Sequence, residues 1–472
     1  MSLSRILPNG LFTTSPYLVG SLVMLFASAA GAHDMVQQGQ AGPYDLTVYI
    51  NPHARVQGFV EVAVRASDDM PERVVVSVVD IDQTGVNHQQ VADLEDGLFR
   101  SSLPTPLKAQ WRVLVQAEGS SGEGRFSIPV AAAAPFAGVA VWVERGFRLI
   151  GWFGLSAALF FGLRLLKRTR RRLLPVSAAV ASPLLFVGST GELAERVFYN
   201  PAVYSRLYQP ARIDTKVDSE RLEIELSSPG LVRFRRFDDL IPDHGHPMHL
   251  YALRLPELDR VYHLHPEMTG PGTFEKQLPS VSAGRYFTVA DIVHEGGLWE
   301  APQGRLDLPV AVYGGPFQGD DSGGAGHPIS QARFDADSFE FEDGLKMAWR
   351  RPSDLRPDEP LRLQFELQDR EGHVLPDAEL YMGMMGHAAI MRHDLEVFSH
   401  VHPTGSISMA SVDALNGDAE TAMMCHTPAS GDIHRAEVAF PYAFPQPGSY
   451  RLIVQMKRAG DVKTAFFDAI VD

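Results

Sequence analysis

The stretch HLHP, His263–Pro266, is echoed later in the chain by HVHP, His400–Pro403. In each copy two histidines lie one residue apart, and the residue between them is apolar. Because side chains alternate across a β-strand, a strand would project both imidazoles from one face and Leu264 or Val401 from the other. The motif therefore predicts two strands that each present a pair of histidines.

A further histidine precedes each pair by about the length of a β-hairpin: His249 in GHPMHL and His387 in GMMGHA. A strand, a short polar turn and a second strand would place that histidine beside its pair. Three neutral imidazoles that converge, with methionines nearby, form a metal site. The spacing therefore predicts two three-histidine sites.

The candidate ligands divide between the two sites and one additional segment. They are His249, His263, His265 and Met268 at the first site, and His387, His400, His402 and Met385 at the second. Further contributors are His244, His246, His294 and Met248 at the first site and Met384 and Met391 at the second. The MMCH segment adds Cys425 and His426 as soft or imidazole ligands, although a Met-Met-Cys run also packs in cores. The alternative for HxHP itself is a solvent-exposed strand end.

Composition limits the class of protein. A chain of 472 residues predicts about three domains. The formal net charge of −15 argues against nucleic acid as a partner. The single cysteine excludes an intramolecular disulfide, so the compartment has to be inferred from targeting signals.

The N-terminus has the pattern of a secretory signal peptide over residues 1–32. Arg5 precedes an apolar run, and small residues end at Ala32, where cleavage is expected. The run is short for a membrane span, although an uncleaved anchor is the alternative. Cleavage would leave His33 as the new N-terminus, where its α-amine and imidazole can bind copper together.

Residues 145–190 are predicted to form two transmembrane helices. Apolar stretches at 149–166 and 173–188 flank the basic turn KRTRRR at 167–172. The positive-inside rule places this turn in the cytoplasm and both flanking regions outside the inner membrane. One span followed by an interfacial helix is the alternative, because the second stretch is short and contains prolines.

Three regions are rich in short β-branched and aromatic runs separated by turn residues: 33–132, 210–316 and 327–472. The pattern predicts a mainly β protein with three immunoglobulin-like or cupredoxin-like β-sandwich domains besides the transmembrane hairpin. The Gly/Asp/Ser-rich stretch at 319–326 is expected to be a flexible linker.

The two C-terminal regions look like copies of one unit. RLEIEL at 221–226 matches LRLQFEL at 361–367, and LPSVSAGRY at 278–286 matches FPQPGSY at 444–450. Five residues after the tyrosine comes Asp291 in one copy and Gln455 in the other. The N-terminal region shares part of this pattern but lacks HxHP, so the scaffold does not need those histidines to form.

The ligand set favours copper. Calcium needs clustered oxygen ligands, which these stretches lack. Imidazole with thioether suits copper in either oxidation state, and zinc is the runner-up. Asp291, Gln455 or Glu295 are candidates for hydrogen bonds to the ligating histidines. No phosphate loop, nucleophile elbow or HExxH motif is present, so binding is a simpler interpretation than catalysis.

The segments HLYALRLPELDRVYHLHPEM and GHAAIMRHDLEVFSHVHPTG, each followed by an LPSVSAGRY-like stretch, resemble YtkA/FixH-like bacterial periplasmic domains. That resemblance implies copper handling and a link to the assembly of respiratory oxidases. The order of signal peptide, β-domain, membrane hairpin and β-domain is also similar to the B subunit of particulate methane and ammonia monooxygenases. That family has an HxH pair in its N-terminal domain, which is missing here.

The sequence thus predicts a membrane-anchored periplasmic protein that binds copper for storage, resistance or delivery to a membrane oxidase or a copper-trafficking partner. One alternative is a structural or assembly subunit that docks a membrane complex through its β-domains. The other is a metal-dependent oxidoreductase subunit.

Overall fold

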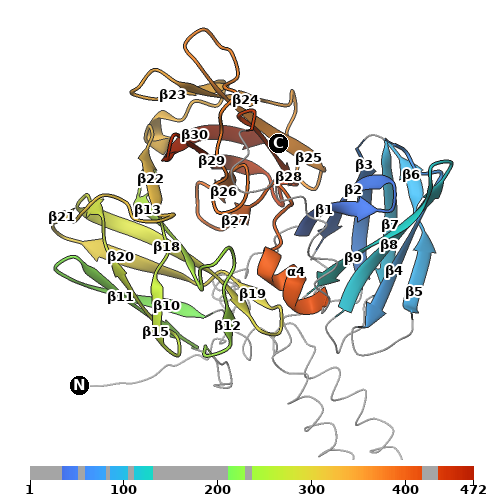
Figure 1. Cartoon of the computed structure of the whole chain (residues 1–472), viewed down its shortest axis with the longest axis horizontal. Helices are drawn as coiled ribbons and strands as arrows, with labels where there is room; N and C mark the ends of the chain where they lie inside the picture. Colours follow the sequence, from blue (N-terminus) through green and yellow to red (C-terminus); the bar gives the residue numbers. More distant parts are fainter. Residues whose placement is uncertain are drawn as a thin grey trace, which may run out of the picture.

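The protein is described by a computed structural model that covers residues 35–51, 59–67, 69–80, 86–104, 111–130, 211–228, 237–416 and 434–472. The described residues are mainly β, and the sheets form several sandwich-like layers, as the sequence predicts. Figure 1 shows three groups of strands, coloured blue, green to yellow, and orange to red along the sequence. Each group surrounds a hydrophobic cluster of its own.

The N-terminal domain consists of two sheets. One contains β1 (Met35–Ala41), β2 (Tyr44–Asn51), β3 (Phe59–Ala66), β7 (Leu98–Pro104) and β6 (Asp93–Glu95) in that order, and the other contains β5 (Val86–Val91), β4 (Arg73–Asp80), β8 (Trp111–Gly119) and β9 (Gly122–Val130). Buried and half-buried residues alternate along most of β8, the period of two that a strand with one face in the core requires.

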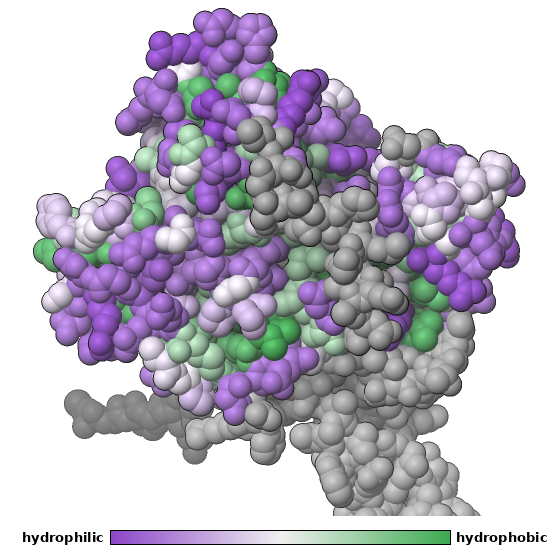
Figure 2. Space-filling view, in the orientation of Figure 1, coloured by the Kyte–Doolittle hydropathy of each residue, from purple (hydrophilic) through white to green (hydrophobic). Residues whose placement is uncertain are grey.

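The second domain carries the HLHP motif. Its main sheet runs β15 (Glu267–Gly270), β16 (Thr273–Gln277), β11 (Arg221–Ser227), β10 (Arg212–Asp218), β20 (Gln303–Leu308), β18 (Gly284–His294), β13 (His249–Leu255), β14 (Arg260–Leu264) and β22 (Ser322–Ala325), while β12 (Leu240–Ile241) and β19 (Trp299–Glu300) also pair with β18. β17 (Ser280–Val281) and β21 (Val312–Tyr313) form a separate pair. In Figure 2 the surface over β20 and β11 is mostly hydrophilic, as expected for a face in contact with solvent.

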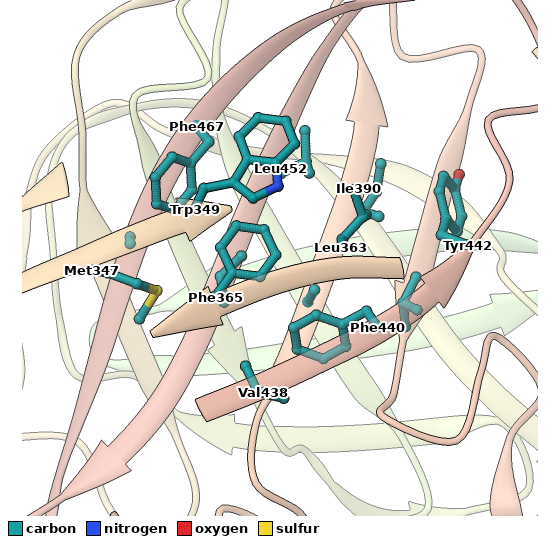
Figure 3. Close-up of a cluster of buried hydrophobic side chains, with 14 of the residues drawn as sticks. Met347, Trp349, Leu363, Phe365, Ile390, Val438, Phe440, Tyr442, Leu452 and Phe467 are labelled. Carbon is teal, nitrogen blue, oxygen red and sulfur yellow. The ribbon is translucent and has the colours of Figure 1, made fainter. Parts of the chain in front are cut away.

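The third domain carries HVHP and has two four-stranded sheets. The first is β23 (Ser338–Glu340), β24 (Lys346–Arg350), β25 (Leu361–Gln368) and β28 (Glu437–Tyr442), and the second is β27 (Phe398–Val401), β26 (His387–Arg392), β29 (Gly448–Arg458) and β30 (Asp461–Val471). Their inner faces meet in a buried cluster that includes Trp349, Phe365 and Phe467 (Figure 3). Short helical segments are η2 (Ile329–Gln331) and α4 (Met409–Asn416).

The repeat predicted for the two C-terminal domains is visible in the strand pairing. β13 lies between β14 and β18, and β26 lies between β27 and β29 in the same antiparallel order. His249 is directly opposite Asp291 in one ladder, and His387 is directly opposite Gln455 in the other. The polar residues that follow the two tyrosines are therefore equivalent in structure as well as in sequence.

The two repeats pack against each other through the sheet faces that carry the histidines. An apolar cluster joins residues of both domains, namely Tyr251, Leu253, Leu258, Val261, Phe287 and Val289 from the second domain and Ala389, Met391, Phe398, Ile453 and Phe466 from the third. Burial of this surface supplies the non-directional part of the domain contact.

A buried ion pair supplies hydrogen bonds of defined geometry at the domain contact. Arg451 and Asp468 are fully buried and lie on the neighbouring strands β29 and β30, with Arg451 Nε 3.0 Å from Asp468 Oδ1. Arg451 also donates to the carbonyls of Leu258 and His327, each at 2.8 Å. The guanidinium therefore satisfies backbone oxygens that the second domain and the following connection would otherwise bury without partners.

The stretch at 319–326 is not a free linker, so that prediction was wrong. Four of its residues form β22, which pairs with β14 and places Ser322 opposite His263. A Cβ on Gly324 would lie 2.7 Å from Thr464, and one on Gly326 would lie 2.5 Å from Phe466. The glycines are needed because this strand passes close to β30, and composition alone could not distinguish that need from flexibility.

The N-terminal domain contacts the C-terminal repeats beside the HVHP motif. Gln38 in β1 donates its backbone N–H to the carbonyl of Thr404 at 2.7 Å. Ile407 and Val412 join the hydrophobic cluster of the N-terminal domain, and α4 lies between that domain and the second one (Figure 1). The backbone N–H of Ala410 in α4 donates to Asp243 at 3.0 Å.

Several predicted features lie outside the described residues: the signal peptide at 1–32, the new N-terminus at His33, the helical hairpin at 145–190, and the MMCH segment with Cys425 and His426. Within the described ranges, no helix combines the length and the apolar character that a membrane crossing requires.

Asp468→Asn is expected to lower the free energy of unfolding by about 3 to 5 kcal/mol at pH 7, because Arg451 would stay buried without its counter-charge. Burial would raise the pKa of Asp468, but hydrogen bonds from His327 and His393 and the charge of Arg451 outweigh it and hold the pKa well below its usual range. The charged form is thus favoured in the folded state. The difference between wild type and variant should be complete near neutral pH and shrink as the pH falls below about 4.

Urea denaturation at several pH values measures this difference. Asp369→Asn is the matched control, since Asp369 is on the surface and pairs only locally with His373. A variant as stable as wild type at pH 7 would show that the ion pair does not hold the repeats together.

Candidate metal centre

The HxHP motifs end their strands inside the motif. β14 stops at Leu264 and β27 at Val401, because the following His-Pro leaves the ladder and proline has no N–H to donate. Leu264 and Val401 point into the cores of their own domains, while the histidines of both motifs lie outside these cores and are buried, with His263 in ring contact with His400 of the other repeat. The alternation expected from the sequence is therefore present in both copies.

Among the residues that the structure describes, eight histidines meet where the second and third domains face each other. They are His244, His246, His249, His263, His265, His387, His400 and His402. Ring centroids lie 4.7 Å apart for His263 and His265, 4.4 Å apart for His400 and His402, and 5.4 Å apart for His249 and His400 across the domain boundary. The two predicted sites thus form one continuous centre.

The first group contains His249, His263 and His265, the three histidines expected from the spacing. One nitrogen of each lies within 4.8 Å of the others, and His249 Nδ1 is 3.3 Å from His263 Nε2. Two nitrogens that bind one tetrahedral ion at the usual bond length are about 3.3 Å apart. The spacing of this pair therefore already fits an ion of that kind.

The partners of the first group fix which nitrogen carries the proton. His249 Nε2 is 3.1 Å from the carbonyl oxygen of Asp243, and His263 Nδ1 is 3.0 Å from Gln455 Oε1. His265 Nδ1 is 3.2 Å from Asp321 Oδ1. These oxygens only accept, so the three facing nitrogens are the donors.

It follows that the opposite nitrogen of each neutral ring is bare. Three lone pairs, on His249 Nδ1, His263 Nε2 and His265 Nε2, are left in one group. Two bare nitrogens that face each other at 3.3 Å repel unless a cation or a proton lies between them. A cation bound to these nitrogens would remove the repulsion between their lone pairs, so the arrangement is able to hold a metal ion.

The orientation of Gln455 supports this assignment. Its Nε2 donates to Ser322 Oγ at 2.7 Å and lies 3.2 Å from Thr464 Oγ1, which leaves Oε1 toward His263. Asp321 is held in turn by Lys276 at 2.6 Å. The residues behind the first group are therefore oriented themselves, as is usual for partners of metal-binding histidines.

The second group contains His244, His387 and His402. The sequence predicted His400 in place of His244, and the structure regroups them. His244 belongs to the second domain and reaches across the boundary, with ring centroids 5.3 Å from His387 and 5.0 Å from His402. Spacing within one repeat could not show this contact, because it exists only when the two repeats face each other.

His400 lies between the two groups. Its ring centroid is 5.4 Å from both His249 and His387. Its Nδ1 is 2.9 Å from Asp291 Oδ2, so its Nε2 is bare. That nitrogen is buried without a hydrogen-bond partner among the described residues. His400 is thus available as a further ligand to either group.

Asp291 and Gln455 exchange partners between the repeats. Gln455 of the third domain holds His263 of the second, while Asp291 of the second domain holds His400 of the third. Such reciprocal contacts are the mark of a two-fold relation, here between two repeats of one chain. The sequence suggested both residues as partners of the histidines but not that each serves the opposite repeat. Glu295, the third candidate, is exposed.

Burial keeps these imidazoles neutral. Desolvation lowers the pKa of His249 to about 4 and that of His400 to about 3. The pKa values of His263, His265, His387 and His402 are also well below the usual range, chiefly because of burial. Burial raises the pKa of Asp291 to about 7. At neutral pH the rings therefore keep their lone pairs for a metal.

Aromatic rings lie against histidines of both groups. Tyr251 stacks on His263 with centroids 4.2 Å apart and ring planes 16° from parallel. Tyr381 donates its hydroxyl hydrogen to the carbonyl of Asp320 at 2.8 Å and packs its ring edge against His387. These walls limit the contact of the histidines with water.

Other predicted ligands have different surroundings. Met268 and Met385 are half-buried against the cores of the second and third domains, and Met248 is fully buried in the first of these cores. His294 is hydrogen-bonded to Asp239 at 2.9 Å. The sequence treated His244 only as a contributor, although the HGH pattern at 244–246 is a second HxH signal.

Comparison with known proteins leaves the family open. A family model described as "Domain of unknown function (DUF8832)" matches residues 340–472, the third domain. No curated protein matches the chain. Among solved structures, Escherichia coli alpha-2-macroglobulin activated by porcine elastase is 10% identical with a TM-score of 0.17, over 88% of this chain and 29% of that one.

A bacterial ice-binding adhesin is 7% identical with a TM-score of 0.16, over 92% of this chain and 98% of that one. The FN1–FN3 domains of chicken CNTN1 are 9% identical with a TM-score of 0.13, over 88% of this chain and 94% of that one. Similarity at this level says nothing about what the chain does.

His387→Met is expected to raise the stability of the metal-free protein by about 1 to 2 kcal/mol, because both ring nitrogens of His387 are buried without a partner among the described residues. Thermal unfolding in the presence of a chelator measures the effect. His373→Met, at a surface position, should change stability by less than about 0.5 kcal/mol. Marked destabilisation by His387→Met would indicate that this histidine serves the fold rather than a ligand.

Proposed function

We propose that this chain is a membrane-anchored periplasmic protein that binds copper between its two C-terminal repeats, for storage, resistance or delivery to a membrane oxidase. The observation that carries the proposal is the convergence of three bare imidazole nitrogens, on His249, His263 and His265, with acceptors behind all three rings. A site that served only the fold would pair these nitrogens with donors.

The choice of copper rests on ligand chemistry. Imidazole nitrogens suit copper and zinc, and copper has the higher affinity among divalent ions. The turn at Tyr381–Met384 has the same closure as the turn at Asp243–His246, with a left-handed residue at its second position in each. Met382 and Met384 in that turn are largely buried beside the centre's tyrosine wall, and thioethers favour copper over zinc.

The proposed location rests on the sequence. The pattern at 1–32 is that of a signal peptide, and the two apolar stretches flanking KRTRRR are those of a membrane hairpin with its turn in the cytoplasm. This arrangement places the three β-domains on the periplasmic side. A respiratory oxidase or a copper-trafficking protein is the expected partner, and the acidic net charge of −15 disfavours nucleic acid.

The full chain, purified and dialysed after exposure to equal copper and zinc, is expected to retain one or two copper atoms per molecule. Replacement of His263, His265, His400 and His402 together by alanine should abolish binding, because the change removes ligands from both groups. Mass spectrometry of the bound metal gives the count. His373→Ala, which removes a surface histidine, is the matched control.

A folded wild-type chain that retains no metal would contradict this proposal. That result would favour the alternative of an assembly subunit whose histidines do not bind metal. The alternative predicts co-purification with a membrane partner whether or not metal is present. Retention of zinc in preference to copper would keep the site and change its metal.

A further inference from the structure

We propose that the centre holds two copper ions of unequal affinity: a tightly bound ion in the group of His249, His263 and His265, and a weakly bound ion in the group of His244, His387 and His402. This inference rests on the proposed function. It follows from a difference in what lies behind the two sets of rings.

The two groups use separate ligands. Within the described part of the chain no histidine belongs to both, and each group offers one nitrogen per ring within 4.8 Å of the others. His400 stands between them with a bare Nε2, and its ring is closest to His402, at 4.4 Å between centroids. It can complete a four-nitrogen set on the second group. The ligand supply is therefore sufficient for two ions.

The rings of the first group are oriented before any ion arrives. Gln455, Asp321 and the carbonyl of Asp243 each accept a hydrogen bond from one ring. An ion that binds there meets lone pairs already directed inward and leaves no N–H without an acceptor. Loss of such partners typically reduces metal affinity about 10-fold to 100-fold.

The second group lacks this support. Both ring nitrogens of His387 and both of His402 are buried without a hydrogen-bond partner among the described residues. An ion would satisfy one nitrogen of each ring, and the other N–H would stay buried and unpaired. The unpaired N–H groups therefore lower the metal affinity of the second group, whereas the first group has no such cost.

The second group also depends on the domain arrangement. His244 comes from the second domain, whereas His387 and His402 come from the third. The turn of His402 is closed onto Gly405 at 2.7 Å, and its Thr404 carbonyl is bonded to the N-terminal domain. An ion there must bring together ligands on three segments from two domains. The three ligands of the first group all come from one domain, and the other domain orients one of them through Gln455. A ligand set that is itself divided between domains again favours weaker binding.

The local charge accommodates two cations. Asp243 and Asp291 are buried at the centre, with Asp243 Oδ2 4.0 Å from His244 Nε2 and Asp291 Oδ2 2.9 Å from His400 Nδ1. A cation nearby favours the ionised form of each carboxyl group, and that negative charge offsets the repulsion between ions at adjacent groups. A second ion is thus electrostatically acceptable, although it binds after the first.

The test is a competition titration of the full chain with Cu⁺ under a reductant, against chromogenic chelators of graded affinity. Wild type is expected to bind two ions in two separated steps. His265→Gln should remove the tight step and His402→Gln the weak one, each leaving one ion per chain. Circular dichroism and thermal unfolding of both metal-free variants check that they fold.

Gln455 provides a sharper discrimination, because its amide oxygen accepts a hydrogen bond from His263, whereas the ring nitrogens of His387, its neighbour across the ladder, have no hydrogen-bond partner among the described residues. Gln455→Leu should weaken the tight step about 10-fold to 100-fold and leave the weak step within about 2-fold. Gln455→Glu keeps an acceptor at this position, as Asp291 does in the other repeat, and should restore tight binding. If Gln455 served only the fold, Gln455→Leu would not weaken the tight step selectively, and Gln455→Glu would not restore it.

The outcomes separate the two proposals. No bound copper in the wild type would overturn the proposed function. One ion per chain, two steps of equal affinity, or loss of all copper in His402→Gln would overturn the inference of two unequal sites while leaving copper binding in place.

Discussion

The centre depends on a reciprocal pair of hydrogen bonds, His263 to Gln455 and His400 to Asp291, each of which crosses the boundary between the repeats. Each bond sets the tautomer of one imidazole and aims its free nitrogen into the shared space. Each also ties the position of that ring to the placement of the other domain. The orientation of the histidines therefore depends on how the two domains pack, and neither repeat alone contains the complete centre.

Holding neutral imidazoles in this space is unfavourable without a ligand, and the surrounding packing has to offset it. The apolar cluster between the facing sheets and the buried pair of Arg451 and Asp468 keep the domains in contact. A buried polar atom without a partner costs about 1 to 3 kcal/mol, and the second group has several. Unfavourable burial of this kind is typical of binding sites, where the ligand supplies the missing contacts.

The repeats have diverged at equivalent positions, and the divergence makes the centre asymmetric. A carboxylate in one repeat, Asp291, corresponds to an amide in the other, Gln455. The turn that supplies His244 and His246 in the second domain supplies Met382 and Met384 in the third. Two copies of one unit thus present different side chains and different hydrogen-bond partners without any change in the fold, and the proposal of two unequal metal sites rests on this difference.

The sequence by itself determined the mainly β class, the repeated unit and the faces of the strands, because alternation with a period of two is a local property. The spacing of His249, His263 and His265 was likewise sufficient, since one hairpin brings all three together. Only the tertiary structure decided that His244 replaces His400 in the second group and that the stretch at 319–326 is a strand. Both depend on contacts between segments far apart in the chain: the meeting of two domains, and the pairing of β22 with β14. Local pattern carries no information about which face of one domain will cover another.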